Sequence, residues 1–133
     1  HGIVLFADRD DALEDIRFSN LNLRMHASEL SADFGGNLDF RPAADASRRV
    51  FESPIPAFYA RGVTALCVDG ASIKWASNMP AFYTHGMHIE RFEDLELRNC
   101  RVTASSSSGD IPPIHLGEGR GIKAENISGD IGV

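Results

Sequence analysis

The segment FEDLELRNCRVTA (92–104) decides the fold, because three other segments repeat its pattern of apolar and polar residues. The matching segments are LEDIRFSNLNLRM (13–25), VTALCVDGASIKW (63–75) and GRGIKAENISG (119–129). In chain order, the aligned segments are separated by 50, 29 and 27 residues. A recurrence of this length is typical of proteins built from stacked structural repeats. The sequence therefore predicts that the four segments lie one above another.

Each repeat alternates apolar and polar residues, which is the pattern of a β-strand with one buried face. The alternation slips by one residue at a shared column: Asn20, Gly70, Asn99 and Asn126. In a straight strand this slip would turn all later side chains to the opposite face. A bend at this column keeps both halves pointing inward, and Asn and Gly tolerate the left-handed backbone that a sharp bend requires. We therefore predict two short strands joined at a corner in each repeat.

The columns predicted to point inward are Ile16/Leu66/Leu95/Ile122, Phe18/Val68/Leu97/Ala124, Leu21/Ala71/Cys100/Ile127 and Leu23/Ile73/Val102.

A third short strand is predicted before each repeat, at residues 2–6, 57–60, 86–89 and 113–116. Three short strands per repeat of roughly 22–30 residues describe a parallel β-helix, which is a solenoid. We therefore predict an all-β chain with one domain over residues 1–133 and about four to five coils. An antiparallel β-sandwich is the alternative, because it also has short strands at regular spacing. A sandwich, however, does not require like residues to recur in the same columns.

The first interval between repeats is about twice as long as the others and contains an irregular excursion over residues 27–53. Within it, Leu38 and Phe40 alternate with polar residues, which predicts one additional short strand. Residues 42–53 are predicted to form a loop.

Composition excludes several classes of function. The formal charge of -6 argues against nonspecific binding of nucleic acid, which depends on neutralising phosphates. No apolar run approaches the roughly 20 residues that span a membrane. The two cysteines, Cys67 and Cys100, give no zinc-binding pattern. Cys67 is predicted to point outward and Cys100 inward, so we do not expect them to form a disulfide.

Two stretches, IPAFYARGVTALCVDGASIKWA (55–76) and MHIERFEDLELRNCRVTAS (87–105), resemble late coils of pectin-lyase-like right-handed β-helices. The resemblance is strongest to bacterial proteins related to polygalacturonases, and GNLDFRPA (36–43) is its most particular stretch. It covers roughly residues 1–129. It implies a right-handed parallel β-helix that is secreted or periplasmic and acts on pectin-like or other acidic polysaccharide. We also expect the chain to be part of a longer β-helix, or to assemble with further chains through its open ends.

Polygalacturonases are glycoside hydrolases, and this chemistry uses two carboxylates on either side of a glycosidic bond. The family's Asn-x-Asp motif does not occur in this chain. Asp10 and Asp11 form an acidic pair in a loop, and Asp39 is predicted to face outward; these three are weak catalytic candidates. Arg120-Gly121-Ile122-Lys123 is only loosely similar to the family's Arg-Ile-Lys. We therefore assign no catalytic residue from the sequence.

The tetrapeptide Pro-Ala-Phe-Tyr occurs twice, at 56–59 and 80–83. Near its second copy, Trp75, Phe82 and Tyr83 are candidates for a platform on which a sugar ring stacks, because such aromatics suit amphipathic ligands. The alternative is that Phe58 and Phe82 fill the interior and Trp75 ends an inward strand, and we favour it for Phe58 and Trp75. The side chains predicted to bind substrate are Arg41, Tyr83, His85, His88 and His115.

His88 and His115 are 27 residues apart, which is one repeat, so they are predicted to be neighbours on one face. Together with His85 they suggest a metal site, since zinc takes three or four converging ligands. The same spacing is expected of any polar column, and we predict no metal and no cofactor. The expected partner is a polysaccharide or oligosaccharide, which the chain either hydrolyses or binds as a non-catalytic module.

Overall fold

The structure is a computed structural model that describes residues 2–9, 12–27, 55–106 and 110–133. All regular secondary structure in these ranges is β-strand, so the fold is all-β. The strands are β1 (Ile3–Phe6), β2 (Leu13–Glu14), β3 (Arg17–Ser19), β4 (Asn22–Met25), β5 (Phe58–Thr64), β6 (Cys67–Asp69), β7 (Ser72–Trp75), β8 (Met87–Val102), β9 (Ile114–Leu116), β10 (Gly119–Ser128) and β11 (Ile131–Gly132). The predicted strand at Leu38 and Phe40 and the predicted loop at 42–53 lie outside the described residues.

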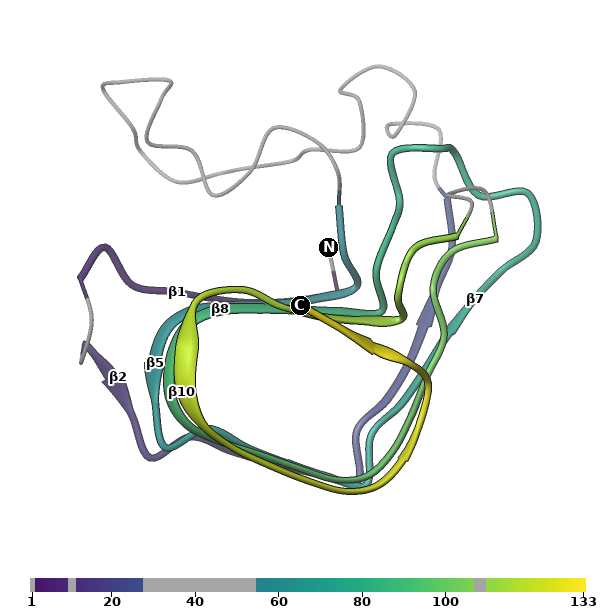
Figure 1. Cartoon of the computed structure of the whole chain (residues 1–133). Coiled ribbons are helices and arrows are strands. Elements are labelled where there is room, and N and C mark those ends of the chain that lie inside the picture. The colour runs from purple at the N-terminus through teal and green to yellow at the C-terminus, as the bar shows by residue number, and fades with distance from the viewer. Residues whose placement is uncertain (1, 10–11, 28–54, 107–109) are drawn as a thin grey trace.

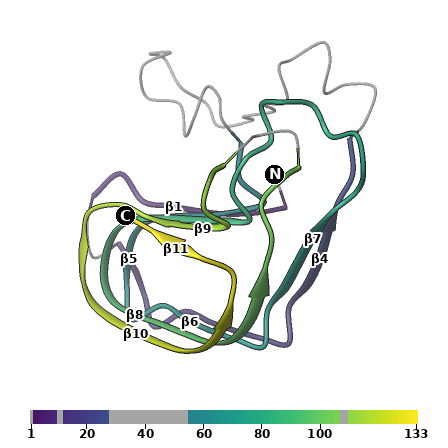
Figure 2. The same ribbon diagram turned by 45° about the vertical axis from the view of Figure 1, so that its right-hand side comes forward.

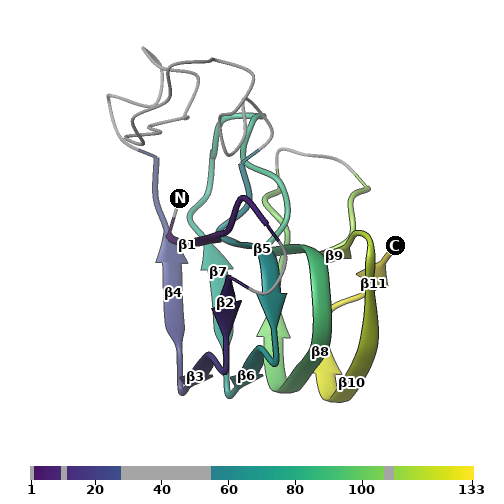
Figure 3. The ribbon, with the colours of Figure 1, turned by 90° about the vertical axis from the view of Figure 1, so that its left-hand side faces the viewer.

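The described strands form one sheet in which every strand pairing is parallel. This excludes the antiparallel sandwich. The sheet curls, and strands of successive layers follow the same curved path around an apolar interior (Figures 1 and 2). The layers lie side by side in chain order, from β1–β4 through β5–β7 and β8 to β9 and β10 (Figure 3).

The register of the sheet confirms the columns predicted from the repeats. Phe18 pairs with Val68, Val68 pairs with Leu97, and Leu97 pairs with Ala124. The strand before each repeat is also in register, since Ile3 pairs with Phe58, which pairs with Met87. Like residues therefore stack in ladders across the layers, as the alignment of the segments required.

The predicted corner is present in the backbone. Asn20, Gly70, Asn99 and Asn126 have φ of 56°, 80°, 51° and 52°, all in the left-handed region. Side chains link three of the layers there: Asn126 Nδ2 donates to Asn99 Oδ1 at 2.7 Å, and Asn99 Nδ2 donates to Asp69 Oδ1 at 3.0 Å. Asn99 and Asn126 thus lie at the bend and also link three successive layers by side-chain hydrogen bonds.

A second left-handed column was not predicted. Asp15, Ala65, Asp94 and Gly121 have φ of 53°, 54°, 55° and 72° and stand immediately before the first inward column. Three of the four, Asp15, Asp94 and Gly121, are of residue types that tolerate this backbone, so the column carried a signal that was not used; Ala65 gives none. Because of these bends, the 16-residue strand β8 can follow the curve of the sheet without a break in its pairing.

Replacing Asn99 by alanine is expected to lower the free energy of unfolding by about 1–2 kcal/mol. The substitution removes both inter-layer hydrogen bonds of the Asn99 side-chain amide. It also places alanine, whose methyl group cannot form a local hydrogen bond, at a φ of 51°. Urea denaturation measures the change. Asn99→Gly is the matched control, because it removes the same hydrogen bonds but tolerates the backbone, and it should cost less. Equal stability of Asn99→Ala and the parent chain would contradict the role of this column.

Inward side chains form one apolar cluster running through the layers. Its largest fully buried members include Phe58, Met87, Ile89 and Ile114. Both cysteines are free; Cys100 is buried and Cys67 is partly exposed, as predicted from their columns. Among the described residues, no helix has the length and apolarity needed to cross a membrane.

Candidate functional site

Polar and ionisable side chains gather where β5, β8 and β9 run next to one another. Because successive residues of a strand point to opposite faces, the residues between the buried Phe58, Ala60, Met87 and Ile89 point outward. Tyr59, His88 and His115 are paired in one ladder, and Arg61 and Glu90 are paired in the next. We call this site the histidine face; it consists of Tyr59, Arg61, His85, His88, Glu90 and His115.

Three imidazole rings lie in mutual contact on the histidine face. The His85 and His115 rings are stacked, with centroids 5.0 Å apart and an interplanar angle of 23°. The His88 ring meets the His115 ring edge-on at 4.8 Å, and its centroid lies 5.7 Å from that of His85. His88 and His115 are also Cα partners, which confirms their predicted proximity.

Glu90 is the acceptor for two donors of the neighbouring strand. Its Oε1 accepts a hydrogen bond from Tyr59 Oη at 2.5 Å and one from Arg61 Nη1 at 3.0 Å. Its Oε2 lies 3.7 Å from His88 Nε2, a contact that becomes an ion pair only when His88 is protonated. Gly117 follows Glu90 in the same column, and a Cβ there would approach Glu90 Cβ to 2.8 Å. A side chain at position 117 would therefore clash with the side chain of Glu90.

Burial keeps His88 and His85 uncharged at neutral pH by lowering the pKa of each ring. It lowers the pKa of His88 to about 4, and the neighbouring His115 and His85 act in the same direction, whereas Glu90 opposes the shift. Burial also lowers the pKa of His85, although its hydrogen bond to the Pro112 carbonyl works against this. For Tyr59, burial raises the pKa of the hydroxyl, followed by its hydrogen bond to Glu90.

The aromatic platform predicted at Tyr83 does not fit the structure. The Tyr83 side chain is only 5% exposed and belongs to the apolar cluster. Its ring packs against Phe82 at 4.7 Å and Trp75 at 5.7 Å between centroids. The backbone of Tyr83 forms an isolated parallel bridge with that of Ile55. Tyr83 is therefore a core residue, and its buried ring is not available to stack on a sugar. The buried Phe58 agrees with the interior role that we favoured.

Four predicted site residues, Asp10, Asp11, Asp39 and Arg41, lie outside the described residues. The structure therefore does not test the weak catalytic candidates or the predicted arginine. Of the predicted binding residues, the structure brings together His85, His88 and His115. It places Tyr83 in the buried apolar cluster instead.

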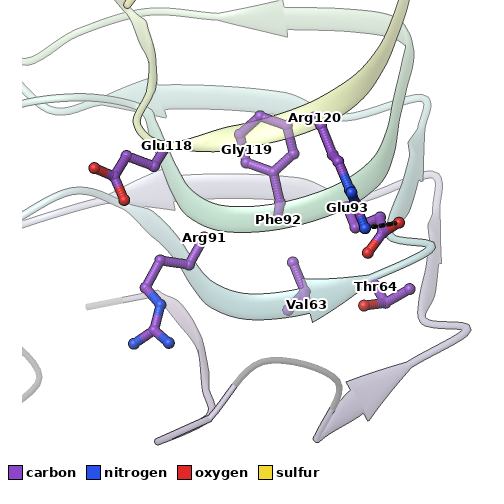
Figure 4. Close-up of a pocket in the computed structure, with 8 residues that line it drawn as sticks. All are labelled: Val63, Thr64, Arg91, Phe92, Glu93, Glu118, Gly119 and Arg120. Carbon is purple, nitrogen blue, oxygen red and sulfur yellow. Dashed lines mark ion pairs between the residues drawn. The ribbon is translucent and has the colours of Figure 1, made fainter.

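A groove of about 560 Å³ lies further along the same strands, after the histidine face. Its apolar part is formed by Val63 and Phe92, and the Phe92 ring lies so close to Gly119 that a Cβ there would come within 2.5 Å of it. Figure 4 shows charged side chains on both sides: Arg91 and Glu118 on one, and the Arg120–Glu93 ion pair of 2.6 Å on the other. The groove therefore combines an apolar floor with a polar rim.

The sequence analysis missed Tyr59, Arg61 and Glu90. Their signal was present, since Tyr59 and Arg61 precede His88 and Glu90 by the same 29 residues that separate two repeats. The outward columns of the third strand carry this information, but of these columns only that of His88 and His115 was used for the prediction. In the part of the chain that the structure describes, no three His, Cys, Asp or Glu side chains are arranged to hold a metal ion.

Comparisons of the chain with protein-family models, with curated proteins and with solved structures found no match.

Proposed function

We propose that this chain is part of a right-handed parallel β-helix that binds an oligosaccharide on its histidine face. The observation that carries the proposal is the cluster of three partly exposed imidazole rings, those of His85, His88 and His115, on the outward face of adjacent parallel strands. A face of this kind repeats along the layers, as the units of a polysaccharide do. In the same proposal the β-helix has about four to five coils and is a secreted or periplasmic protein.

The chemistry of the histidine face suits a sugar. A neutral imidazole offers one donor and one acceptor, which match sugar hydroxyls. Its ring also supplies an apolar surface, so the site joins flat contact area to hydrogen bonding. The groove at Val63 and Phe92 continues the site along the strands, and its rim of Arg91, Glu93, Glu118 and Arg120 adds further polar partners. A bound chain of several sugars is expected to run from the histidines toward the groove.

Hydrolysis is the second candidate, and Glu90 favours it. This carboxylate is partly buried and lies beside His88 on the proposed binding surface. Glycoside hydrolases of the expected class need two carboxylates roughly 5–9.5 Å apart. The contacts of Glu90 among the described residues run to Tyr59, Arg61 and His88. A hydrolytic mechanism would need a second carboxylate at such a distance from Glu90.

Isothermal titration with a panel of pectic oligosaccharides tests the proposed function. We expect binding, and we expect His115→Ala to weaken it about tenfold, since it removes a hydrogen-bonding ring worth roughly 1–1.5 kcal/mol. His26→Ala is the matched control, because His26 is an exposed residue directly after β4 and does not belong to the histidine ladder. Circular dichroism verifies folding of both variants. An absence of binding by the parent chain overturns the proposal, and release of reducing sugar favours the hydrolase.

A further inference from the structure

We propose that the histidine face binds the protonated amino group of an amino sugar, with the Glu90 carboxylate as its acceptor. The inference rests on the proposed function and adds the class of ligand: an oligosaccharide whose units carry a free primary amine. This class differs from the acidic polysaccharide that the resemblance implies. It follows from the hydrogen-bonding groups that the histidine face leaves open to a ligand.

The Glu90 carboxylate uses only one of its two oxygens in the described part of the chain. Oε1 accepts hydrogen bonds from Tyr59 Oη and Arg61 Nη1 at 2.5 and 3.0 Å. Oε2 lies 3.7 Å from His88 Nε2, which is too long for a hydrogen bond. The side chains of Glu90 and His88 are 26% and 23% exposed, so a ligand can approach the carboxylate. Oε2 is therefore available to a donor from a ligand.

The hydrogen bond of His85 fixes which of its two nitrogens is an acceptor. His85 Nδ1 lies 2.7 Å from the Pro112 carbonyl oxygen, which can only accept, so Nδ1 carries the proton. Burial lowers the pKa of His85, so the ring is neutral at pH 7 and its Nε2 is an acceptor. The donors Tyr59 Oη and Arg61 Nη1 are already directed at Glu90. The open atoms of His85 and Glu90 are thus acceptors.

An ammonium group matches these acceptors better than a hydroxyl or a carboxylate does. It has three donors and no acceptor, whereas a hydroxyl has one donor and an ionised carboxylate has none. A hydrogen bond between an ammonium and a carboxylate is also stronger than one between neutral groups. The Arg61 guanidinium is bonded to Oε1, which leaves Oε2 for the ammonium. The formal charge of -6 further favours a cationic oligosaccharide over an acidic one.

The test is isothermal titration at pH 6.0 and about 150 mM salt, which screens long-range attraction. The probes are a glucosamine oligomer, its fully N-acetylated form and oligogalacturonate. At this pH the amine mostly carries its proton, whereas His88, with a pKa of about 4, stays neutral. We expect the glucosamine oligomer to bind about tenfold more tightly than either other oligosaccharide, because only its ammonium makes a charge-assisted hydrogen bond with Glu90.

Glu90→Gln should remove this tenfold preference, because an amide oxygen lacks the negative charge. Glu125→Gln is the matched control, since it changes the net charge equally at an exposed residue of β10 outside the histidine face, and it should keep the preference. Circular dichroism verifies the folding of both variants. The comparison of the oligosaccharides with the parent chain needs no variant, so it decides the question even if Glu90→Gln does not fold.

The outcomes separate this inference from the proposed function. A preference for the glucosamine oligomer that depends on Glu90 supports both. Absence of this preference, or its retention in Glu90→Gln, overturns the amine site and leaves the proposed function standing. Failure of all three oligosaccharides to bind overturns the proposed function as well. Spermidine, a polyamine without sugar rings, is the last probe: if it binds as tightly as the glucosamine oligomer, the assignment to an amino sugar is wrong.

Discussion

Replacing Phe58 by alanine is expected to lower the free energy of unfolding by about 3–5 kcal/mol. Phe58 is 0% exposed and stands at the start of β5, with Ile3 beside it in one layer and Met87 in the next. Its ring meets the Phe18 ring edge-on at 5.4 Å and 83°, so it joins two walls of the curled sheet. Removing the ring leaves a cavity that parallel strands held in register cannot close. Because a domain of this size has roughly 5–15 kcal/mol of stability, much of it would be lost.

Urea denaturation followed by the fluorescence of Trp75, the single tryptophan, measures this loss. Phe58→Leu keeps most of the volume and should cost less than half as much as the alanine variant. Val4→Ala is the surface control, because Val4 is 40% exposed on the adjacent strand β1 and should change stability only slightly. A cost below about 1 kcal/mol for Phe58→Ala would mean that the interior is not closely packed there.

The inward-pointing columns and their register were predicted from the sequence, because a buried position accepts only apolar side chains. The column of Phe18, Val68, Leu97 and Ala124 admits only apolar side chains, and its register was predicted residue by residue. The exceptions are informative: Ile122 and Ala124 are in inward columns but are exposed, Ile122 to 48%, since β10 is the outer layer of the described sheet. Periodicity identifies the column of a residue, and the number of layers that cover it decides its burial.

The outward half was harder to predict, since solvent tolerates many residue types. Ala65 adopts a left-handed backbone without a characteristic residue type, and Asp15 and Asp94 were not recognised as bend residues, so the second corner was not predicted. Tyr83 was predicted to belong to a sugar-stacking platform because aromatic side chains with a polar edge suit amphipathic ligands. In the structure the two copies of the tetrapeptide differ: Tyr59 lies within β5, whereas Tyr83 follows a turn in which its amide donates to the Pro80 carbonyl at 3.1 Å. Both tyrosines are buried, but the Tyr59 hydroxyl donates to Glu90, whereas Tyr83 belongs to the apolar cluster.

Part of the candidate site was predicted from the sequence, and there is a physical reason why each of its residues was predicted or missed. His88 and His115 were found because their spacing equals one repeat. Glu90 and Arg61 obey the same rule, but an acidic and a basic residue on a strand resemble any exposed ion pair, which contributes little. What distinguishes them is the third partner, Tyr59, whose hydroxyl is held at 2.5 Å from Glu90. Such a three-way contact becomes visible only when the outward columns are aligned as strictly as the inward ones.

Acidification is expected to destabilise the protein through His88, by about 2 kcal/mol between pH 7.5 and 5.0. The pKa of His88 is about 4 in the folded chain, against about 6.5 when unfolded, so the unfolded state binds more protons across this range. The stabilising contribution of the neutral ring is complete above pH 6.5 and is lost progressively as the pH falls toward 4. The lowered pKa of His85 acts with the same sign.

Urea denaturation at several pH values measures this effect, and comparison with His88→Gln isolates it from the titration of carboxylates. The variant should lose about 2 kcal/mol less than the parent chain over the same interval, because glutamine has no proton to take up. His26→Gln is the control, because it makes the same substitution at an exposed histidine outside the histidine face. Its free energy of unfolding should depend on pH as that of the parent chain does. Nuclear magnetic resonance of the imidazole C–H groups gives the decisive value: a His88 midpoint near 6.5 would show that burial does not hold this ring neutral, and the parent and variant curves would then be parallel.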